Sequence, residues 1–106
     1  MSKSIGLYAA NVIKCPNCDG IHLHQGKITA YCREREDHTV GTVLIIEKDL
    51  ASREPSDMSE NPSPRRNGMT IDFDCEECDA EPRLAIYQHM GCTYVQWESM
   101  RQKIQD

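Results

Sequence analysis

Two Cys-x-x-Cys turns constrain the fold of this chain more than any other feature. They are Cys15-Pro16-Asn17-Cys18 and Cys75-Glu76-Glu77-Cys78, with 56 residues between them in a chain of 106. Each turn offers two thiolates from one short stretch of backbone, and four thiolates in a tetrahedron are a ligand set that structural Zn2+ prefers. Two such pairs are more often separated by about 15 to 20 residues. One metal ion bound by both turns would therefore tie the front of the chain to its last third.

Six cysteines also allow disulfide bonds, so the redox environment decides between the two chemistries. The segment from Ile5 to Ile13 is mildly apolar, but Gly6 and Asn11 interrupt it and no small-residue cleavage site follows. The strongest apolar run, Val43 to Ile46, is far too short to span a membrane. We therefore expect a cytoplasmic protein, in which thiols stay reduced and such turns bind metal. Zinc is favoured, with another thiolate-bound metal and disulfides as the alternatives.

The composition leaves little for a hydrophobic core. Hydrophobic residues make up 39% and aromatic residues 6%, with one Trp and one Phe. A domain of this size buries about two-thirds of the surface of its unfolded chain, so a metal that adds its binding free energy to folding is physically useful. The formal net charge of −5 supports solubility and opposes non-specific binding to nucleic acid. We predict one domain over residues 1–106.

The pattern of apolar and polar residues is mostly that of short β-strands. We predict strands over residues 5–14, 21–33, 39–47, 69–75, 83–88 and 93–97. Residues 50–67 are rich in Ser, Pro and charged residues, which predicts a long loop that is flexible or functional. Residues 98–105 are predicted to form a short helical turn. The expected fold is mostly β, a zinc-ribbon-like antiparallel sheet with a long polar loop insertion and a short C-terminal helical turn.

Further motifs accompany the cysteine turns. The first turn continues into Asp19-Gly20 and Leu23-His24, residues 61–68 read Asn-Pro-Ser-Pro-Arg-Arg-Asn-Gly, and Gln88-His89-Met90-Gly91 precedes Thr93 and Trp97. Over residues 15–97 these motifs resemble a family of small uncharacterised bacterial and phage zinc-ribbon proteins. The resemblance implies that the ligands are Cys15, Cys18, Cys75 and Cys78, and that Cys32 and Cys92 are not ligands. It implies a fold and a metal, but no activity.

Two cysteines and three of the four histidines are further candidates for metal ligands. Cys32 and Cys92 are expected to be small core residues, with a second partial metal site or a redox-sensitive pair as the alternatives. His22 and His24 point to the same face of a strand, and with His89 they could form a second metal site or a general base. The favoured interpretation is that His24 or His89 supports the site by donating an N–H toward a sulfur or a carbonyl, with a role as an extra ligand as the alternative.

Two charged groups are candidates for binding a partner. Arg65 and Arg66 are the only adjacent basic residues, and they either contact an anion such as phosphate or fold back onto the acids of the chain. The surroundings of the second cysteine turn are acidic and contain the candidates Asp72, Asp74, Glu76, Glu77 and Asp79. This negative charge would repel a nucleic-acid backbone and favours a partner protein with a basic surface. A solubilising surface is the alternative.

No recognisable enzyme motif is present, and four thiolates would fill the coordination shell of a zinc ion. We therefore expect a non-enzymatic protein that binds another protein as an accessory or inhibitory factor. The resemblance to phage proteins adds one concrete version, an anti-CRISPR-like inhibitor of a host nucleic-acid machine. The alternatives are a nucleic-acid-binding ribbon that uses Arg65 and Arg66, and an enzyme with a second metal at the histidines. An exposed sheet edge also allows a dimer.

Overall fold

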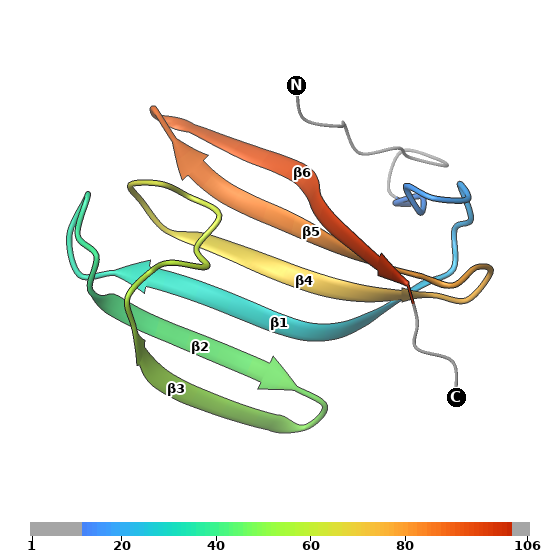
Figure 1. Cartoon of the computed structure of the whole chain (residues 1–106), viewed down its shortest axis with the longest axis horizontal. Helices are drawn as coiled ribbons and strands as arrows, with labels where there is room; N and C mark the ends of the chain where they lie inside the picture. The colour runs from blue at the N-terminus through green and yellow to red at the C-terminus, as the bar shows by residue number, and fades with distance from the viewer. Residues whose placement is uncertain (1–11, 103–106) are drawn as a thin grey trace.

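Six antiparallel strands form one open sheet, which a computed structural model describes over residues 12–102 (Figure 1). The strands are β1 (Leu23–Arg33), β2 (Gly41–Glu47), β3 (Leu50–Ser56), β4 (Gly68–Cys75), β5 (Ala80–His89) and β6 (Cys92–Gln102). Their order across the sheet is β3-β2-β1-β4-β5-β6. The prediction of a mostly β fold is confirmed, because residues 12–102 contain no helix. In this part of the chain no helix is therefore long and apolar enough to cross a membrane.

Tight turns and one long-range pairing explain the strand order. Lys48-Asp49 joins β2 to β3, and Met90-Gly91 joins β5 to β6 with φ values of 51° and 79°. Positive φ at both positions is typical of the two-residue turns that match the twist of a hairpin, and glycine adopts it without strain. β1 and β4 lie between these two hairpins and pair with each other, with Thr29 opposite Thr70. The central pair of strands therefore joins segments that lie far apart in the sequence.

Two predictions of local structure are wrong. Part of the predicted loop 50–67 is a strand, because β3 pairs with β2 along its whole length. Pro55 is tolerated there because β3 is an edge strand, where the outward side needs no ladder hydrogen bond. The predicted helical turn at 98–105 is also absent over the described part, because β6 continues to Gln102 opposite Ala80 of β5. Residues 103–106, and most of the strand predicted over 5–14, lie outside the described residues.

The core is small and lies beside the cysteine turns. Phe73, Leu84 and Trp97 are buried together, and the rings of Phe73 and Trp97 meet edge to face with centroids 5.8 Å apart. A second cluster contains Cys15, Cys75 and Ala80. Leu23 packs against both clusters. The cysteine turns are therefore continuous with the hydrophobic core, so losing their geometry would disturb the packing beneath them.

The connection from β3 to β4, residues 57–67, is held by polar contacts. Ser63 is fully buried, donates to the carbonyl of Gln88 at 2.6 Å and accepts from the amide of Arg66 at 2.8 Å. The guanidinium of Arg33 donates to the carbonyls of Arg66 at 2.9 Å, of Ser63 at 2.7 Å and of His38. One side chain at the end of β1 thus joins this connection to the β1–β2 turn.

We expect Arg33→Lys to loosen residues 57–67 without unfolding the sheet. A lysine ammonium cannot reproduce the planar fork that reaches three carbonyls, and each lost charged hydrogen bond costs about 1.5–3 kcal/mol. Amide hydrogen exchange should become faster over 57–67 and stay unchanged in the middle of β4. Arg53→Lys, the same change on the exposed edge strand β3, is the control. Unchanged exchange over 57–67 would show that Arg33 does not order this connection.

Candidate metal centre

The pairing of β1 with β4 brings the two cysteine turns together. The first turn is closed by hydrogen bonds from the Cys15 amide to the Gly20 carbonyl at 2.8 Å and from the Asp19 amide to the Cys15 carbonyl at 2.9 Å. The second turn connects the end of β4 to the start of β5. Leu23, five residues after the first turn, pairs with Cys75 across the sheet. Antiparallel pairing therefore places both turns at the same end of the sheet (Figure 1).

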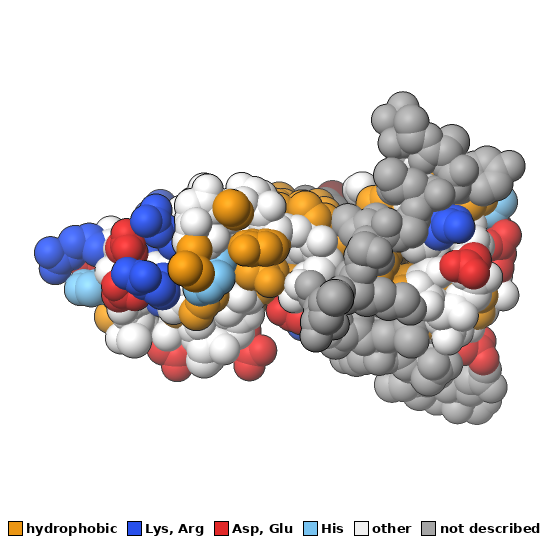
Figure 2. Space-filling model, turned by 90° about the horizontal axis from the view of Figure 1, so that it is seen from above, with side chains coloured by type: hydrophobic (Ala, Val, Ile, Leu, Met, Phe, Trp, Pro, Cys, Tyr) orange, Lys and Arg blue, Asp and Glu red, His pale blue; other side chains and the backbone are white. Residues whose placement is uncertain are grey.

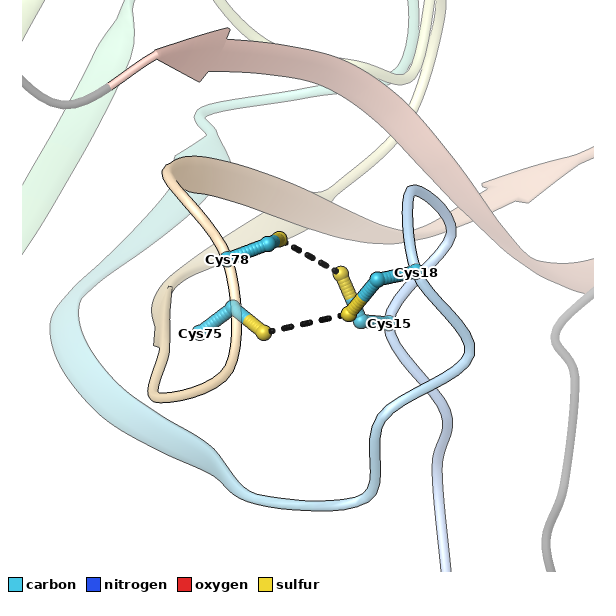
Figure 3. A group of neighbouring side chains, drawn as sticks. All are labelled: Cys15, Cys18, Cys75 and Cys78. Atoms are coloured by element: carbon cyan, nitrogen blue, oxygen red, sulfur yellow. Dashed lines mark hydrogen bonds between the residues drawn. The ribbon is translucent and has the colours of Figure 1, made fainter.

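The four sulfur atoms converge on a common centre (Figure 3). All of them lie within 4.8 Å of one another. The Cys15 and Cys78 sulfurs are 3.8 Å apart, and those of Cys18 and Cys75 are 3.6 Å apart. A tetrahedron with a Zn–S distance of about 2.3 Å has edges of about 3.8 Å. The four cysteines are therefore placed to bind one metal ion.

Amide donors point at the sulfurs from both turns. The backbone amides of Asn17, Gly20 and Glu77 donate to the sulfurs of Cys15, Cys18 and Cys75, each at 3.4 Å. The side-chain amide of Asn17 donates to the Cys78 sulfur, also at 3.4 Å. N–H donors favour the thiolate over the thiol and hold each sulfur in its orientation. This pattern prepares the site for a cation rather than for a disulfide.

The pKa values of the thiols without metal differ widely. The Asn17 side-chain amide, together with the backbone amide of Ala80, lowers the pKa of Cys78 to about 6. The Gly20 amide favours the thiolate of Cys18, but desolvation and the neighbouring sulfurs outweigh it and raise that pKa to about 12. Burial raises the pKa of Cys75. Four thiolates together thus require a bound cation to balance their charge.

Two histidines that follow the first cysteine turn contact carboxylates of the second turn rather than sulfur atoms. His22 Nδ1 lies 3.0 Å from Glu77 Oε1, and His24 Nε2 lies 2.8 Å from Glu76 Oε2. Glu77 raises the pKa of His22, and His24 lowers the pKa of Glu76. His24 therefore differs from its predicted role, since its partner is a carboxylate. The signal for this pairing was present in the sequence as His-x-His and Glu-Glu, but only the register of β1 and β4 aligns the two motifs.

The predicted second metal site is not formed. His89 lies at the end of β5 opposite to the cysteine turns, so it does not join His22 and His24. Over residues 12–102, the four-cysteine cluster is the one group of three or more His, Cys, Asp or Glu side chains placed to hold a metal. His89 was expected to support a metal site or to act as an extra ligand, but the described metal site lies at the other end of β5.

The two spare cysteines are exposed, so the prediction that they are core residues is wrong. Cys32 is in β1 and Cys92 is in β6, and two strands, β4 and β5, lie between them. Three strand spacings correspond to about 14 Å, which is too far for a disulfide. The alternative of a redox-sensitive pair within one chain is therefore wrong as well.

Most of the charged candidates for partner binding are engaged within the chain. Arg65 donates to Asp37 at 2.6 Å and to Glu36 at 2.9 Å, and Arg66 lies 2.8 Å from Glu36. Asp72 accepts from Arg83 at 2.6 Å. Glu76 and Glu77 pair with the histidines. Asp74 and Asp79, which also interact within the chain, lie beside the second turn with exposed side chains. The fold-back interpretation of Arg65 and Arg66 is therefore the one that describes their contacts.

The ion pair at the β1–β2 turn should appear in the titration of Asp37. The Arg65 guanidinium lowers the pKa of Asp37 below its usual value. Because the pKa is lowered in the folded protein, the pair contributes stability above the ordinary aspartate pKa of about 4 and loses it as the pH falls through the folded value. We expect Arg65→Gln to move the Asp37 midpoint, measured by NMR, to higher pH. Arg53→Gln should leave that midpoint unchanged, and an unmoved midpoint in Arg65→Gln would contradict the assignment.

Comparison of the chain with protein-family models, with curated proteins and with solved structures gave no match. The resemblance to zinc-ribbon proteins stated above therefore stays a prediction. The assignment of the four cysteines as a metal site therefore depends on the positions of their sulfur atoms.

Proposed function

We propose that the four cysteines hold one structural Zn2+ ion and that the protein is a non-enzymatic factor that binds another protein. The observation that carries this proposal is a cage of four sulfurs with tetrahedral spacing, continuous with the hydrophobic core. Zinc binds four thiolates in this geometry in structural sites, whereas catalytic zinc sites keep a position open for water. Four sulfur ligands leave no such position. The zinc would stabilise the fold and take no part in a reaction.

Exposed apolar side chains on a single-layer sheet support a protein partner. They are Val40, Leu44, Ile46, Leu50, Met90, Tyr94 and Val95. Of these, Leu44, Ile46 and Val95 share one face of the sheet, because Val95 lies in the same cross-strand row as Leu44. Apolar side chains on one face favour contact with protein, because nucleic-acid recognition depends on cations and stacking aromatic residues. Arg65 and Arg66, the candidates for phosphate, already pair with Glu36 and Asp37. The net charge of −5 supports a partner with a basic surface.

A shallow trough of about 840 Å3 adds surface suited to a protein partner. Its lining includes the buried Thr29 and Thr70 together with Val43, Ile45 and residues 55–57. The lining thus combines apolar and polar side chains, and such a combination is typical of a surface that binds another protein. An accessory or inhibitory factor, including an inhibitor of a host nucleic-acid machine, could use such a surface without any catalytic group.

Metal analysis tests the zinc part of the proposal. We expect one zinc per chain in protein purified without added metal. Cys78→Ser should lower that content, because three ligands bind less tightly than four, whereas Cys92→Ser and His24→Ala should retain it. Two metals per chain with one lost in His24→Ala would overturn the assignment. Iron at one equivalent with the absorption of a thiolate complex would replace zinc as the metal.

Capture experiments test the partner. Tagged, zinc-loaded protein is incubated with a lysate treated or not treated with nuclease, and bound proteins are identified by mass spectrometry. Proteins bound equally in both samples support a protein partner. Direct binding to single- or double-stranded DNA, with a steep salt dependence that Arg65→Ala with Arg66→Ala removes, would instead establish the nucleic-acid alternative. Loss of every captured protein after nuclease treatment would also contradict the proposal.

A further inference from the structure

The two edges of the sheet differ in how they are protected. β3 and β6 are the edge strands, and an edge strand presents unpaired backbone N–H and C=O groups to any strand that approaches. Natural sheets block such edges with proline or with charged side chains. β3 contains Arg53, Glu54 and Pro55, whereas the segment Cys92–Trp97 of β6 contains neither a charge nor a proline. Over Cys92–Trp97, the β6 edge therefore lacks the protection that β3 has.

The hairpin geometry identifies the backbone groups that β6 presents. In a two-residue hairpin the first facing pair, here His89 and Cys92, exchanges hydrogen bonds, and the pattern then alternates along the strand. The amides and carbonyls of Thr93 and Val95 consequently point away from β5. The hydrogen bond from the Gln88 amide to the Asn67 carbonyl agrees with this alternation, because Gln88 is the partner of Thr93 and points toward β4. The outer edge of β6 thus offers donors and acceptors in regular alternation.

The same argument shows why β3 is closed to pairing. β2 and β3 are joined by a two-residue turn with Glu47 opposite Leu50, so Ala51, Arg53 and Pro55 are the residues whose backbone faces outward. Pro55 has no N–H, and Arg53 places a charge at an outward position. An approaching strand would find a missing donor and a charged side chain on β3, but neither of them over Cys92–Trp97 of β6.

Hydrophobic side chains surround the open edge. Figure 2 looks onto this side of the molecule, and hydrophobic side chains gather there over the hairpin end of the sheet. Met90, Tyr94 and Val95 are among the exposed large hydrophobic residues, and Cys92 is exposed beside them. Val95 also ends a row that crosses the sheet through Ile86, Met69, Ala30 and Leu44. This row places apolar side chains on one face and leads directly to the edge.

From these observations we infer that the outer edge of β6, over Cys92–Gln96, pairs antiparallel with the same strand of a second copy of this chain. A two-fold axis near Tyr94 or Val95 matches each outward amide with an outward carbonyl of the other copy, because both copies have the same alternation. The segment carries no charge, so two copies meet without like-charge repulsion. The apolar row of one copy continues into the row of the other. Among the described strands the remaining edges of such a dimer are the blocked β3 strands, so assembly stops at two chains.

Sedimentation of the full-length, metal-loaded protein over a concentration series tests this interface. We expect a mass that approaches twice the 12.1 kDa of one chain as the concentration rises. Val95→Lys should weaken self-association by about tenfold or more, because two ammonium groups would meet near the axis. Leu44→Lys is the matched control, because Leu44 lies in the same row and is 42% exposed against 41% for Val95, but in the interior strand β2. It should leave the mass unchanged.

Each other result overturns the inference. A wild-type protein that stays monomeric at submillimolar concentration has no such interface, and a dimer that survives Val95→Lys uses another surface. Loss of the dimer in both variants would indicate packing through the apolar face instead of pairing at the edge. Retained zinc content in each variant shows that it is folded.

Hydrogen exchange of the wild-type protein gives a test that needs no variant. We expect the amides of Thr93 and Val95 to be protected at high concentration and to exchange faster on dilution. Those of Tyr94 and Gln96, which bond to β5, should stay protected throughout. Protection of Thr93 and Val95 that does not change on dilution would assign this edge to another segment of the same chain. That result, or rapid exchange at every concentration, would contradict pairing with a second copy.

Discussion

Removal of the metal is expected to unfold this protein. Binding of structural zinc by cysteine ligands contributes about 10–16 kcal/mol at neutral pH, whereas a domain of this size has a total stability of about 5–15 kcal/mol. Cys15 and Cys75 are fully buried, and Leu23 packs against both their cluster and that of Phe73, Leu84 and Trp97. Loss of the metal would leave thiols that repel one another when ionised, in the middle of this packing. The folded sheet should not survive that change.

An excess of a strong zinc chelator provides the measurement. The cooperative thermal transition should disappear, and the emission of Trp97, the one Trp of the chain, should shift to longer wavelength as its buried ring meets water. Cys75→Ser should reproduce this state without chelator. Cys92→Ser changes an exposed cysteine outside the cage and should melt like the wild type. A chelated protein with an unchanged transition would show that the four cysteines do not hold the fold together.

The second large effect is expected from the core beside the cysteine turns. Leu84 is 3% exposed and packs with Phe73 and Trp97. Leu84→Ala removes buried methyl groups and leaves a cavity, which costs about 2–5 kcal/mol. Because this core is small, such a loss is a large share of the stability of the domain. Urea unfolding of the zinc-loaded protein should therefore show a much lower midpoint, with Trp97 emission as the signal.

Leu50→Ala is the matched control for that experiment. The substitution is the same, but Leu50 is 73% exposed at the start of the edge strand β3. Surface changes of this kind alter the free energy of unfolding by about 0.5 kcal/mol or less. Equal effects of the two substitutions would contradict the location of the core. A large effect of Leu50→Ala alone would indicate that β3 packs against something in solution.

Local patterns predicted the elements that depend on neighbouring residues. The alternation of Met69, Ile71 and Phe73 indicated β4, and Met90-Gly91 indicated the turn of the last hairpin. The predictions failed where pairing overrides composition. Residues 50–56 contain Pro and several polar residues, yet they form β3 because the adjacent β2 offers a complete set of backbone partners. The end of β6 likewise follows β5 and not its own helix propensity.

For the site as well, predictions that depend on neighbouring residues succeeded, and those that depend on strand pairing failed. Two short turns were sufficient to name four candidate ligands, because the spacing within each turn already places its two sulfurs side by side. The contacts of the charged residues could not be predicted from the spacing of neighbouring residues. Arg65 and Asp37 lie 28 positions apart, and His24 and Glu76 lie 52 positions apart. The β1–β4 register brings His24 to Glu76, and the connection 57–67 brings Arg65 to Asp37 in the β1–β2 turn. These contacts turn charges expected to bind a partner into ion pairs within the chain.

The sequence by itself determined the four-cysteine set, the mostly β character and most of the strands, since all of these follow from spacing and alternation over a few residues. The tertiary structure decided everything that depends on register. It placed Leu23 opposite Cys75, which closes the 56-residue separation of the turns into one sulfur cage. It also placed β3 and β6 at the two edges of the described sheet. The physical reason is that backbone hydrogen bonds between strands are nearly independent of sequence, so the partner of a strand is selected by the packing of the whole sheet.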